Sequence, residues 1–443
     1  MDVPWGVCAS SASTGSDNGI AVAFPFMEVP MKELRWFAGV DWGAEKHAVC
    51  ILDEAGSVLG ERFFEHSGDG VAELCSWLLE VSKAEAHTIS VAIETPHGAV
   101  VDTLLERAFP VHTINPKQVD RFRDRFTMPG AKDDRRDARV LADSLRTDEP
   151  CFRRLRVDEP AVIELREWSR LADELQEEHG RLANRVYHQL LRYYPQMFEL
   201  ADDYGSDSFL ALWELLPTPA AAARAREKDV ARHLKEHRIR RFDAKHVLET
   251  LRQKPLYVAP GTTEAATAHI ASLAARLRLV NRQLRDAHQR LDSLTKALGS
   301  SNEADPGQAN EQRDVDILRS LPGVGRIVLA TLLAEASQPL AARDYHALRT
   351  LVGVAPITRR SGKKTVILMR YACHPRLRNA VYHWARVASQ YDQKTKATYA
   401  ALRAKGHSHG RALRSVADRI LRMACAMLRN GTLFDPNHVR SAA

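Results

Sequence analysis

Apolar residues recur at heptad spacing between residues 270 and 298, and this repeat limits the possible folds more than any other feature of the sequence. It is typical of a coiled coil, although one long amphipathic helix packed within a bundle shows the same pattern. A second helical segment, 158–200, has similar spacing and is a candidate partner. We therefore expect an α-helical arm with coiled-coil character over residues 157–298. The repeat consists of Ile270, Leu273, Leu277, Val280, Leu284, Ala287, Leu291, Leu294 and Leu298.

The residues before this arm have the pattern of a mixed α/β domain. Three short apolar runs separated by turn residues at 36–65 predict a three-stranded meander. A meander followed by alternating strands and helices predicts a mixed sheet with helices packed against it. We place this domain at 32–156. The alternating segments are a helix at 71–82, a strand at 88–93, a helix at 98–108 and a strand at 111–114.

The residues after the arm are strongly basic. Residues 299–312 have the Gly, Ser, Asn and Pro content of a linker, and 313–436 is expected to be a mostly α-helical C-terminal domain. Residues 340–430 contain 19 Lys and Arg against three Asp and Glu, a net charge of +16. The whole chain carries only +7, so the remainder sums to −9. A basic domain joined to an acidic remainder indicates a protein that binds nucleic acid.

Composition narrows the class of protein further. The 443 residues are 45% hydrophobic and 27% charged, which excludes a fibrous chain or one disordered throughout. No run of 18 uncharged apolar residues occurs, so we expect no membrane-spanning helix. The six cysteines are scattered, which favours a reduced cytoplasmic compartment over a disulfide framework or a zinc site. Residues 1–31 are interpreted as a disordered tail or an upstream extension, and 437–443 as a second tail.

Four carboxylates stand at positions from which they can converge. Asp41 and Glu94 each end an expected strand, and Asp134 and Asp137 are three residues apart on one face of an expected helix. Clustered carboxylates need cations to neutralise them, and hard oxygen ligands suit Mg²⁺ or Mn²⁺, which can clamp the reacting oxygens of a phosphodiester. Asp133 rivals Asp134, because it lies four residues from Asp137. For each carboxylate taken singly, a turn cap or a place on a solvated helix face is the favoured interpretation, and only the order Asp, Glu, Asp, Asp on this strand pattern is more specific.

Two motifs in the basic domain indicate contacts with phosphates. Residues 318–325 resemble a helix-hairpin-helix turn, in which Gly323 and Gly325 let the backbone approach a phosphate; an ordinary glycine-containing turn is the alternative. Farther on, Ser361 is expected in a loop among four cations, which can bind phosphates and stabilise a pentacovalent transition state. By composition alone, this serine is either a nucleophile or a hydrogen-bond donor. The four cations are Arg359, Arg360, Lys363 and Lys364.

Together these motifs resemble those of the DEDD transposases of bacterial insertion sequences, over most of residues 36–436. The resemblance implies a RuvC-like N-terminal domain with the RNase H fold, followed by the coiled-coil arm and a helical transposase domain. The family pattern Lys-Thr-Asp-x-x-Asp-Ala selects Asp134 over Asp133, which stands where the family usually has Thr. The segments that carry the resemblance are Gly39–Gly43 with Lys46 and His47, Ala92–Glu94, Asn115–Val119, Lys132–Ala138, Arg359–Lys363, His374–Ala380 and Gly406–Asp435.

The resemblance also implies a function. The chain would be a site-specific DNA recombinase that cuts and rejoins strands through Ser361, while Asp41, Glu94, Asp134 and Asp137 hold Mg²⁺ or Mn²⁺. Implied partners are donor and target DNA and a noncoding bridge RNA that guides the enzyme by base pairing. The coiled coil would support homodimers that assemble into tetramers in the bacterial cytoplasm, at the nucleoid. The expected nucleic-acid contacts are Lys132, Gly323, Gly325, Arg359, Arg360, Lys363, Lys364, Arg376 and Arg378.

The residues alone leave three other classes open. A RuvC-like junction-resolving nuclease would use the four carboxylates with water as the nucleophile, and Ser361 would only bind phosphate. A sugar-kinase-like or actin-like ATPase also begins with Asp-x-Gly on a first strand, as at 41–43, but the sequence has no second glycine-rich phosphate loop of that kind. In a nucleic-acid scaffold without catalysis, the carboxylates would be structural.

Overall fold

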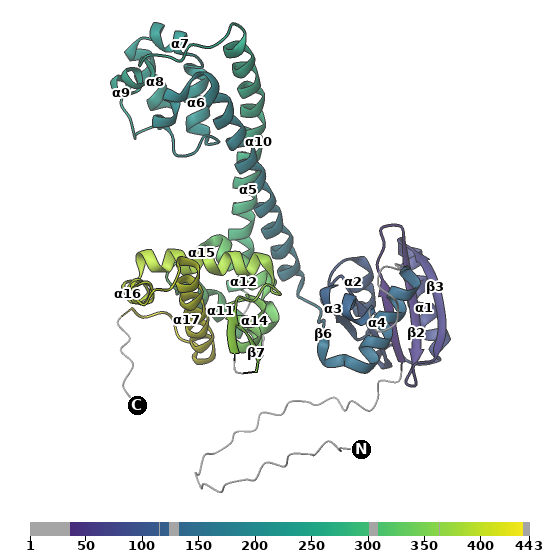
Figure 1. The fold of residues 1–443 in the computed structure, drawn as a ribbon. Helices are drawn as coiled ribbons and strands as arrows, with labels where there is room; N and C mark the ends of the chain where they lie inside the picture. The colour runs from purple at the N-terminus through teal and green to yellow at the C-terminus, as the bar shows by residue number, and fades with distance from the viewer. Residues whose placement is uncertain (1–35, 115, 124–132, 301–308, 363, 437–443) are drawn as a thin grey trace, which may run out of the picture. The chain divides into compact units, whose positions relative to one another are not determined.

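The computed structural model describes residues 36–114, 116–123, 133–300, 309–362 and 364–436. It divides into two compact units, Met1–Val157 and Asp158–Ala443 (Figure 1). Within the described ranges, no helix is both long enough and apolar enough to cross a membrane.

The first unit is built on a six-stranded mixed sheet with the order β3-β2-β1-β4-β5-β6. The first three strands form the expected antiparallel meander, and the next two run parallel to β1. The last strand returns antiparallel at the edge. The strands are β1 (Trp36–Asp41), β2 (Lys46–Asp53), β3 (Val58–Glu65), β4 (Ile89–Ile93), β5 (Val111–Thr113) and β6 (Arg153–Arg154).

Helices cover both faces of this sheet. Ala38 and Val40 of β1 pack in one core with the first two helices, while Phe37, on the other face, packs with the last two. Because β1 and β4 are buried on both sides, their sequences are almost wholly apolar, with buried Ser90 as an exception in β4. The prediction of a mixed α/β domain is confirmed. Its helices are α1 (Gly68–Ser82), α2 (Ala99–Glu106), α3 (Pro116–Arg123) and α4 (Asp134–Asp148), with short 3₁₀ turns η2 (Ala86–Thr88) and η3 (Glu149–Cys151).

The second unit begins with a pair of long helices, α5 (Pro160–Tyr193) and α10 (Thr262–Ser300), which pack along each other (Figure 1). The chain between them folds into a small helical module that the sequence pattern did not resolve. This module shares one hydrophobic core with the long pair. It consists of η4 (Pro195–Leu200), α6 (Asp207–Leu215), α7 (Pro219–Arg224), α8 (Glu227–Glu236) and α9 (Ala244–Leu251).

The heptad stripe of α10 is buried within the chain itself. Ile270, Leu277 and Leu291 are fully buried in the core that α10 shares with α5. The helix that the sequence offered as a partner is therefore the one that covers the stripe. The expected helical arm is present as an intramolecular helix pair.

The remaining residues form a second, mostly helical core, as expected. Between two of its helices lies a β-hairpin, where the sequence analysis expected a loop. The pairing of Ser361 with Lys364, and Gly362 at φ 56° beside it, explain the hairpin. The elements are α11 (Ala309–Ser320), α12 (Arg326–Glu335), α13 (Ser337–Ala341), α14 (Tyr345–Leu351), β7 (Ile357–Ser361), β8 (Lys364–Leu368), α15 (Pro375–Tyr391), α16 (Gln393–Ala404) and α17 (His409–Asn430).

Candidate functional site

Two of the predicted carboxylates lie at the same edge of the sheet in the first unit. Asp41 is the last residue of β1, and Glu94 directly follows β4. These strands are parallel neighbours, with Val40 opposite Ile93 in the register. Because the carboxyl ends of parallel strands share one edge of a sheet, Asp41 and Glu94 are adjacent by topology.

A glycine in β1 brings a third carboxylate to this edge. A Cβ atom on Gly39 would lie 2.0 Å from the Ala138 carbonyl oxygen and 2.6 Å from the Ala142 nitrogen, so the backbone of α4 rests directly on the strand. Asp137 immediately precedes Ala138 and is only 3% exposed. Close helix–strand contact at Gly39 therefore positions Asp137 beside the ends of the two strands.

Arg123, at the end of α3, joins two of these carboxylates. Its Nε and Nη2 donate to Asp137 at 2.7 and 2.9 Å, and Nη2 also donates to Glu94 Oε1 at 3.4 Å. Burial disfavours the charged guanidinium, but hydrogen bonds and attraction from Asp137 and Glu94 together raise the pKa of Arg123 above its ordinary value. The edge therefore holds a cation between two carboxylate groups. Carboxylate oxygens are the ligand type that Mg²⁺ prefers, but here the guanidinium of Arg123 occupies them.

The two rival aspartates at the start of α4 have different surroundings. Asp133 is the N-cap, and its side chain accepts a hydrogen bond from the Arg135 backbone N–H at 3.3 Å. Asp134 is the first helical residue, and its side chain is exposed. Throughout the described ranges, no three His, Cys, Asp or Glu side chains group closely enough to hold a metal ion. The structure thus brings Glu94 and Asp137 together around Arg123, and it does not gather all four carboxylates into a ligand set.

A histidine pair next to Asp41 was missed by the sequence analysis. His47 is fully buried, and its Nε2 lies 2.9 Å from Nδ1 of His66. The Gly43 N–H donates to the other ring nitrogen of His47 at 3.4 Å, and exposed Trp42 lies against both rings. Burial and the neighbouring His66 lower the pKa of His47. A neutral His47 that donates from Nε2 satisfies both contacts. The pairing spans 19 residues, and no local pattern marks it.

The predicted nucleophile lies at the tip of the hairpin in the second unit. Ser361 ends β7, pairs with Lys364 across the turn, and is exposed, as are Arg359 and Arg360 on the same strand. Two further predicted contacts, Lys132 and Lys363, fall outside the described residues, as does the side chain of Lys364. The hydroxyl is therefore presented on a protruding two-stranded ribbon rather than in a cleft.

Of the two glycines in the turn before α12, one is required by the packing of the fold. Gly323 has φ 84°, and a Cβ there would lie 2.8 Å from the Ala388 nitrogen of α15. The Trp384 indole N–H donates to the Pro322 carbonyl at 2.9 Å. Gly325 is different, because it caps α12 and has open space where a Cβ would be. Packing against α15 explains Gly323, and only Gly325 faces space that a ligand can enter.

Arg376, another predicted contact, lies in an internal network. It donates to Asp173 and Ser169 of α5 at 2.8 and 2.9 Å and to Glu335 of α12 at 2.5 Å. Glu335 is nearly buried, which by itself raises its pKa, but Arg170, His374 and Arg376 outweigh burial and lower it. This network fastens α12 and α15 to the long helix pair. Its neighbour Arg378 contacts the Cys373 sulfur at 3.7 Å.

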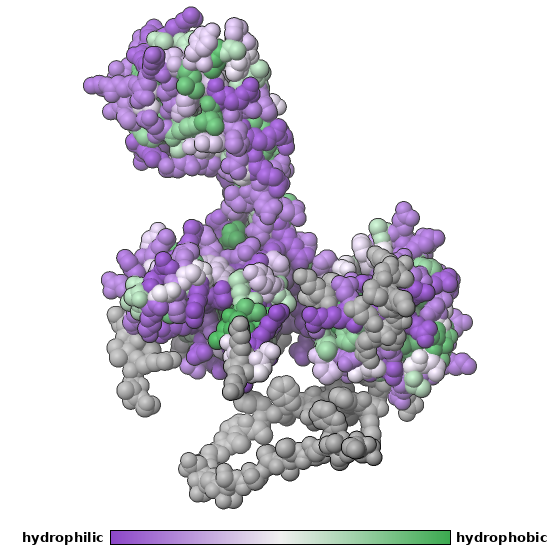
Figure 2. Space-filling view, viewed as in Figure 1, coloured by the Kyte–Doolittle hydropathy of each residue, from purple (hydrophilic) through white to green (hydrophobic). Residues whose placement is uncertain are grey.

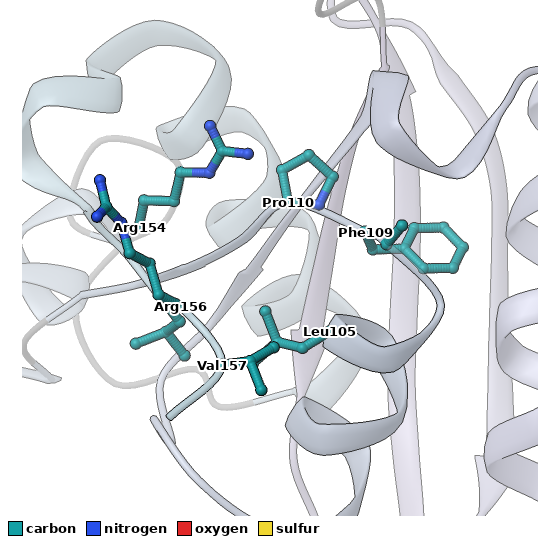
Figure 3. Close-up of a pocket in the computed structure, with 8 residues that line it drawn as sticks. Leu105, Phe109, Pro110, Arg154, Arg156 and Val157 are labelled. Atoms are coloured by element: carbon teal, nitrogen blue, oxygen red, sulfur yellow. The ribbon is translucent and has the colours of Figure 1, made fainter. Parts of the chain in front are cut away.

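A cavity of about 510 Å³ in the first unit lies at another edge of the sheet (Figure 3). Its lining includes Pro110, which precedes β5, and Arg154 of β6. Since β5 runs parallel to β4, its beginning lies opposite the edge that carries Glu94. Figure 3 shows Leu105 and Val157 close together on one side, with Arg154 and Arg156 above them. This pocket is separate from the carboxylate edge.

Comparison with known proteins places both parts of the chain among transposases. Residues 38–195 match a DEDD transposase model of the IS110 type, described as a transposase, and this range includes the four carboxylates. Residues 315–400, which include Ser361, match the model described as transposase IS116/IS110/IS902 family.

Individual relatives agree with these matches. The mini-circle protein of IS117 from Streptomyces coelicolor, named as a transposase candidate, is 32% identical over 91% of this chain and 96% of its own length. The y4uE protein of Sinorhizobium fredii, also named as a transposase candidate, is 53% identical over 55% of this chain and 70% of its own length. An uncharacterized 42 kDa protein of insertion element IS900 from Mycobacterium paratuberculosis is 26% identical over 92% of this chain and 99% of its own length.

Proposed function

Because this chain belongs to the IS116/IS110/IS902 family of insertion-element transposases, we propose that it cuts and rejoins DNA through a covalent bond to Ser361. The observation that carries the proposal is the exposed position of this serine at a hairpin tip, with Arg359 and Arg360 exposed beside it. A side chain on a projecting ribbon can reach the phosphate of a duplex, and the flanking cations can bind its oxygens.

The proposed reaction consists of two transesterifications, each of which breaks one phosphate ester bond and forms another. The Ser361 hydroxyl attacks a backbone phosphorus, loses its proton, and forms a phosphoserine ester, while the broken strand leaves with a free hydroxyl. A hydroxyl end of another strand then attacks this ester, restoring a phosphodiester and the free serine. One phosphate ester is exchanged for another at each step, so no ATP is required.

We propose that Asp41, Glu94, Asp134 and Asp137 hold a divalent cation, Mg²⁺ or Mn²⁺, that neutralises the scissile phosphate when bound. Support comes from the cation already held there, since Arg123 bridges Glu94 and Asp137. An ion that binds both carboxylates must displace at least part of this guanidinium. Arg123 thus keeps the carboxylates together and neutralised before the ion binds.

The proposed binding partners come from the resemblance to the transposases of this family. We propose donor DNA, target DNA and a noncoding bridge RNA as the nucleic acids, supported by the net charge of +16 on residues 340–430. We also propose homodimers that pair into tetramers. Since the heptad stripe is covered by α5, a dimer contact requires other faces of the arm. Figure 2 shows this helix pair largely hydrophilic with isolated hydrophobic areas, and Leu171 and Leu279 are exposed apolar residues there.

The serine is tested by a denaturing pull-down. The protein is expressed with the noncoding DNA that flanks its element, and purification in denaturant retains only DNA that is covalently attached. We expect an adduct with wild type, none with Ser361→Ala, and an adduct with the control Thr365→Ala, which removes a hydroxyl from the facing strand of the same hairpin. Recombination by Ser361→Ala refutes the nucleophile.

The same experiment separates the junction-resolving nuclease. That enzyme would leave free ends and no adduct, with cleavage that still depends on Asp41. The variant Asp41→Asn abolishes cleavage in both cases, so the presence of the adduct in wild type decides between them. Sequencing RNA that copurifies under native conditions tests the guide, since enrichment of the element's own noncoding transcript is expected.

A further inference from the structure

A second cavity, of about 200 Å³, lies beside α10 in the helical module that joins the two long helices. It is lined from three elements that are distant in the sequence. Arginines at spacings of four and three residues place one face of α10 toward it, because such spacings repeat on one side of a helix. The lining residues are Asp207 and Ser208 of α6, His237 after α8, and Arg278, Arg282 and Arg285 of α10.

The arginine charges in this cavity are only partly used within the protein. Arg285 pairs with Asp207 at 2.7 Å, and Arg278 pairs with Glu214 through Nη2 at 2.5 Å. The Nε of Arg278 is buried without a hydrogen-bond partner in the part of the chain that the structure describes. Arg282 is exposed and forms no ion pair among those residues. The charge of Arg282 and the Nε–H of Arg278 therefore have no acidic partner or acceptor among the described residues.

The acidic side of the cavity is already committed. Burial disfavours the ionised carboxyl of Asp207, but hydrogen bonds from Asn281 and Arg285 hold its pKa below the ordinary value. Asn281 donates to one carboxylate oxygen at 2.8 Å while Arg285 takes the other. Asp207 thus positions Arg285 and has both oxygens occupied. What remains open to a ligand is a set of donors from Arg278, Arg282, Ser208 and His237.

We infer that this cavity binds a backbone phosphate of a nucleic acid held by the transposase. Converging guanidinium donors recognise phosphate oxygens, and exposed Arg282 offers a charge that no acid of the described residues pairs with. The loop after His237 continues the basic surface, since Arg238 and Arg240 follow it and are exposed. The inference rests on the proposed function and adds a phosphate site far along the chain from both the carboxylates and the serine.

The test measures binding of the full-length protein to a labelled single-stranded RNA and a labelled DNA duplex by fluorescence anisotropy across a salt series. We expect Arg278→Gln/Arg282→Gln to weaken binding of at least one probe about tenfold. The slope of log affinity against log salt should fall by about 0.7–0.9 for each phosphate that the variant no longer neutralises. Weakening confined to the RNA or to the DNA identifies the source of the phosphate.

The matched control is Arg276→Gln/Arg290→Gln, which removes two charges from exposed ion pairs of α10 outside the cavity. A second variant, Arg282→Glu, changes only an exposed residue without an ion pair among the described residues, so it should fold normally and bind more weakly than wild type. Equal binding by cavity and control variants overturns the inference while leaving the proposed function intact. If the wild-type protein binds neither the RNA nor the DNA, the phosphate site and the proposed function are both refuted.

Discussion

Replacing Gly39 by alanine should separate α4 from the sheet. The added Cβ would stand 2.0 Å from the Ala138 oxygen, 2.6 Å from the Ala142 nitrogen and 2.9 Å from the Leu141 Cβ, against 3.4–4 Å for ordinary contact. The two nearest atoms belong to backbone, so no rotamer change can relieve the clash and the helix must shift by more than 1 Å. Overpacking of this kind costs about 3 kcal/mol, the upper end of the usual range.

Hydrogen exchange of the full chain, measured by mass spectrometry, tests the predicted loss of stability around residue 39. A loss of about 3 kcal/mol should speed exchange in β1 and α4 by roughly 100-fold, because each 1.4 kcal/mol is a factor of ten. Gly68→Ala is the control, since that glycine begins α1 with open space around it and alanine is the better helix former. Exchange in Gly39→Ala that matches wild type would refute the account of how Asp137 is positioned.

Three further predictions concern titratable groups inside the fold. Glu335→Ala should lower the free energy of unfolding by about 3 kcal/mol in urea titrations, because the partly buried Arg170 and Arg376 lose hydrogen bonds to a buried carboxylate; exposed Glu167→Ala should cost far less. Burial and Arg154 lower the pKa of His112 to about 4. Protonation then favours the unfolded chain, so melts should show up to about 3 kcal/mol lost as pH falls from about 6.5 to about 4, and His112→Gln should remove this loss. Arg123→Gln should tighten Mn²⁺ binding several-fold in calorimetric titrations, and Asp137→Asn should weaken it.

Much of the first unit could be predicted because its signals are local. Short apolar runs bounded by turn residues mark the meander, and parallel strands must end at one edge, which brings Asp41 near Glu94. The helix partner of the heptad stripe was harder to assign. An a/d pattern shows that a face is buried and does not say whether the covering helix belongs to the same chain. In this structure it does, since α5 covers the stripe.

The missed features depend on contacts between distant residues. Arg123 is one of many arginines in the sequence, and only the fold shows that it reaches Asp137. The cavity beside α10 combines residues from 207 to 285. The hairpin was missed for a different reason: the charged residues around Ser361 are typical of a loop, and the apolar run that indicates a strand covers only 366–368. The four-carboxylate ligand set remains a prediction.

Net charge alone misjudges where this protein can contact nucleic acid. Among the cations that give residues 340–430 their charge of +16, several are bound to acids of the fold. Arg343 pairs with Asp314, Arg349 with Asp418, and Arg376 with Glu335. Their positive charge stabilises packing between helices and is largely neutralised there. Arg359 and Arg360 on the hairpin are exposed instead. The salt dependence of DNA binding should therefore respond to neutral substitutions on the hairpin more strongly than to those of paired arginines, although both change the net charge equally.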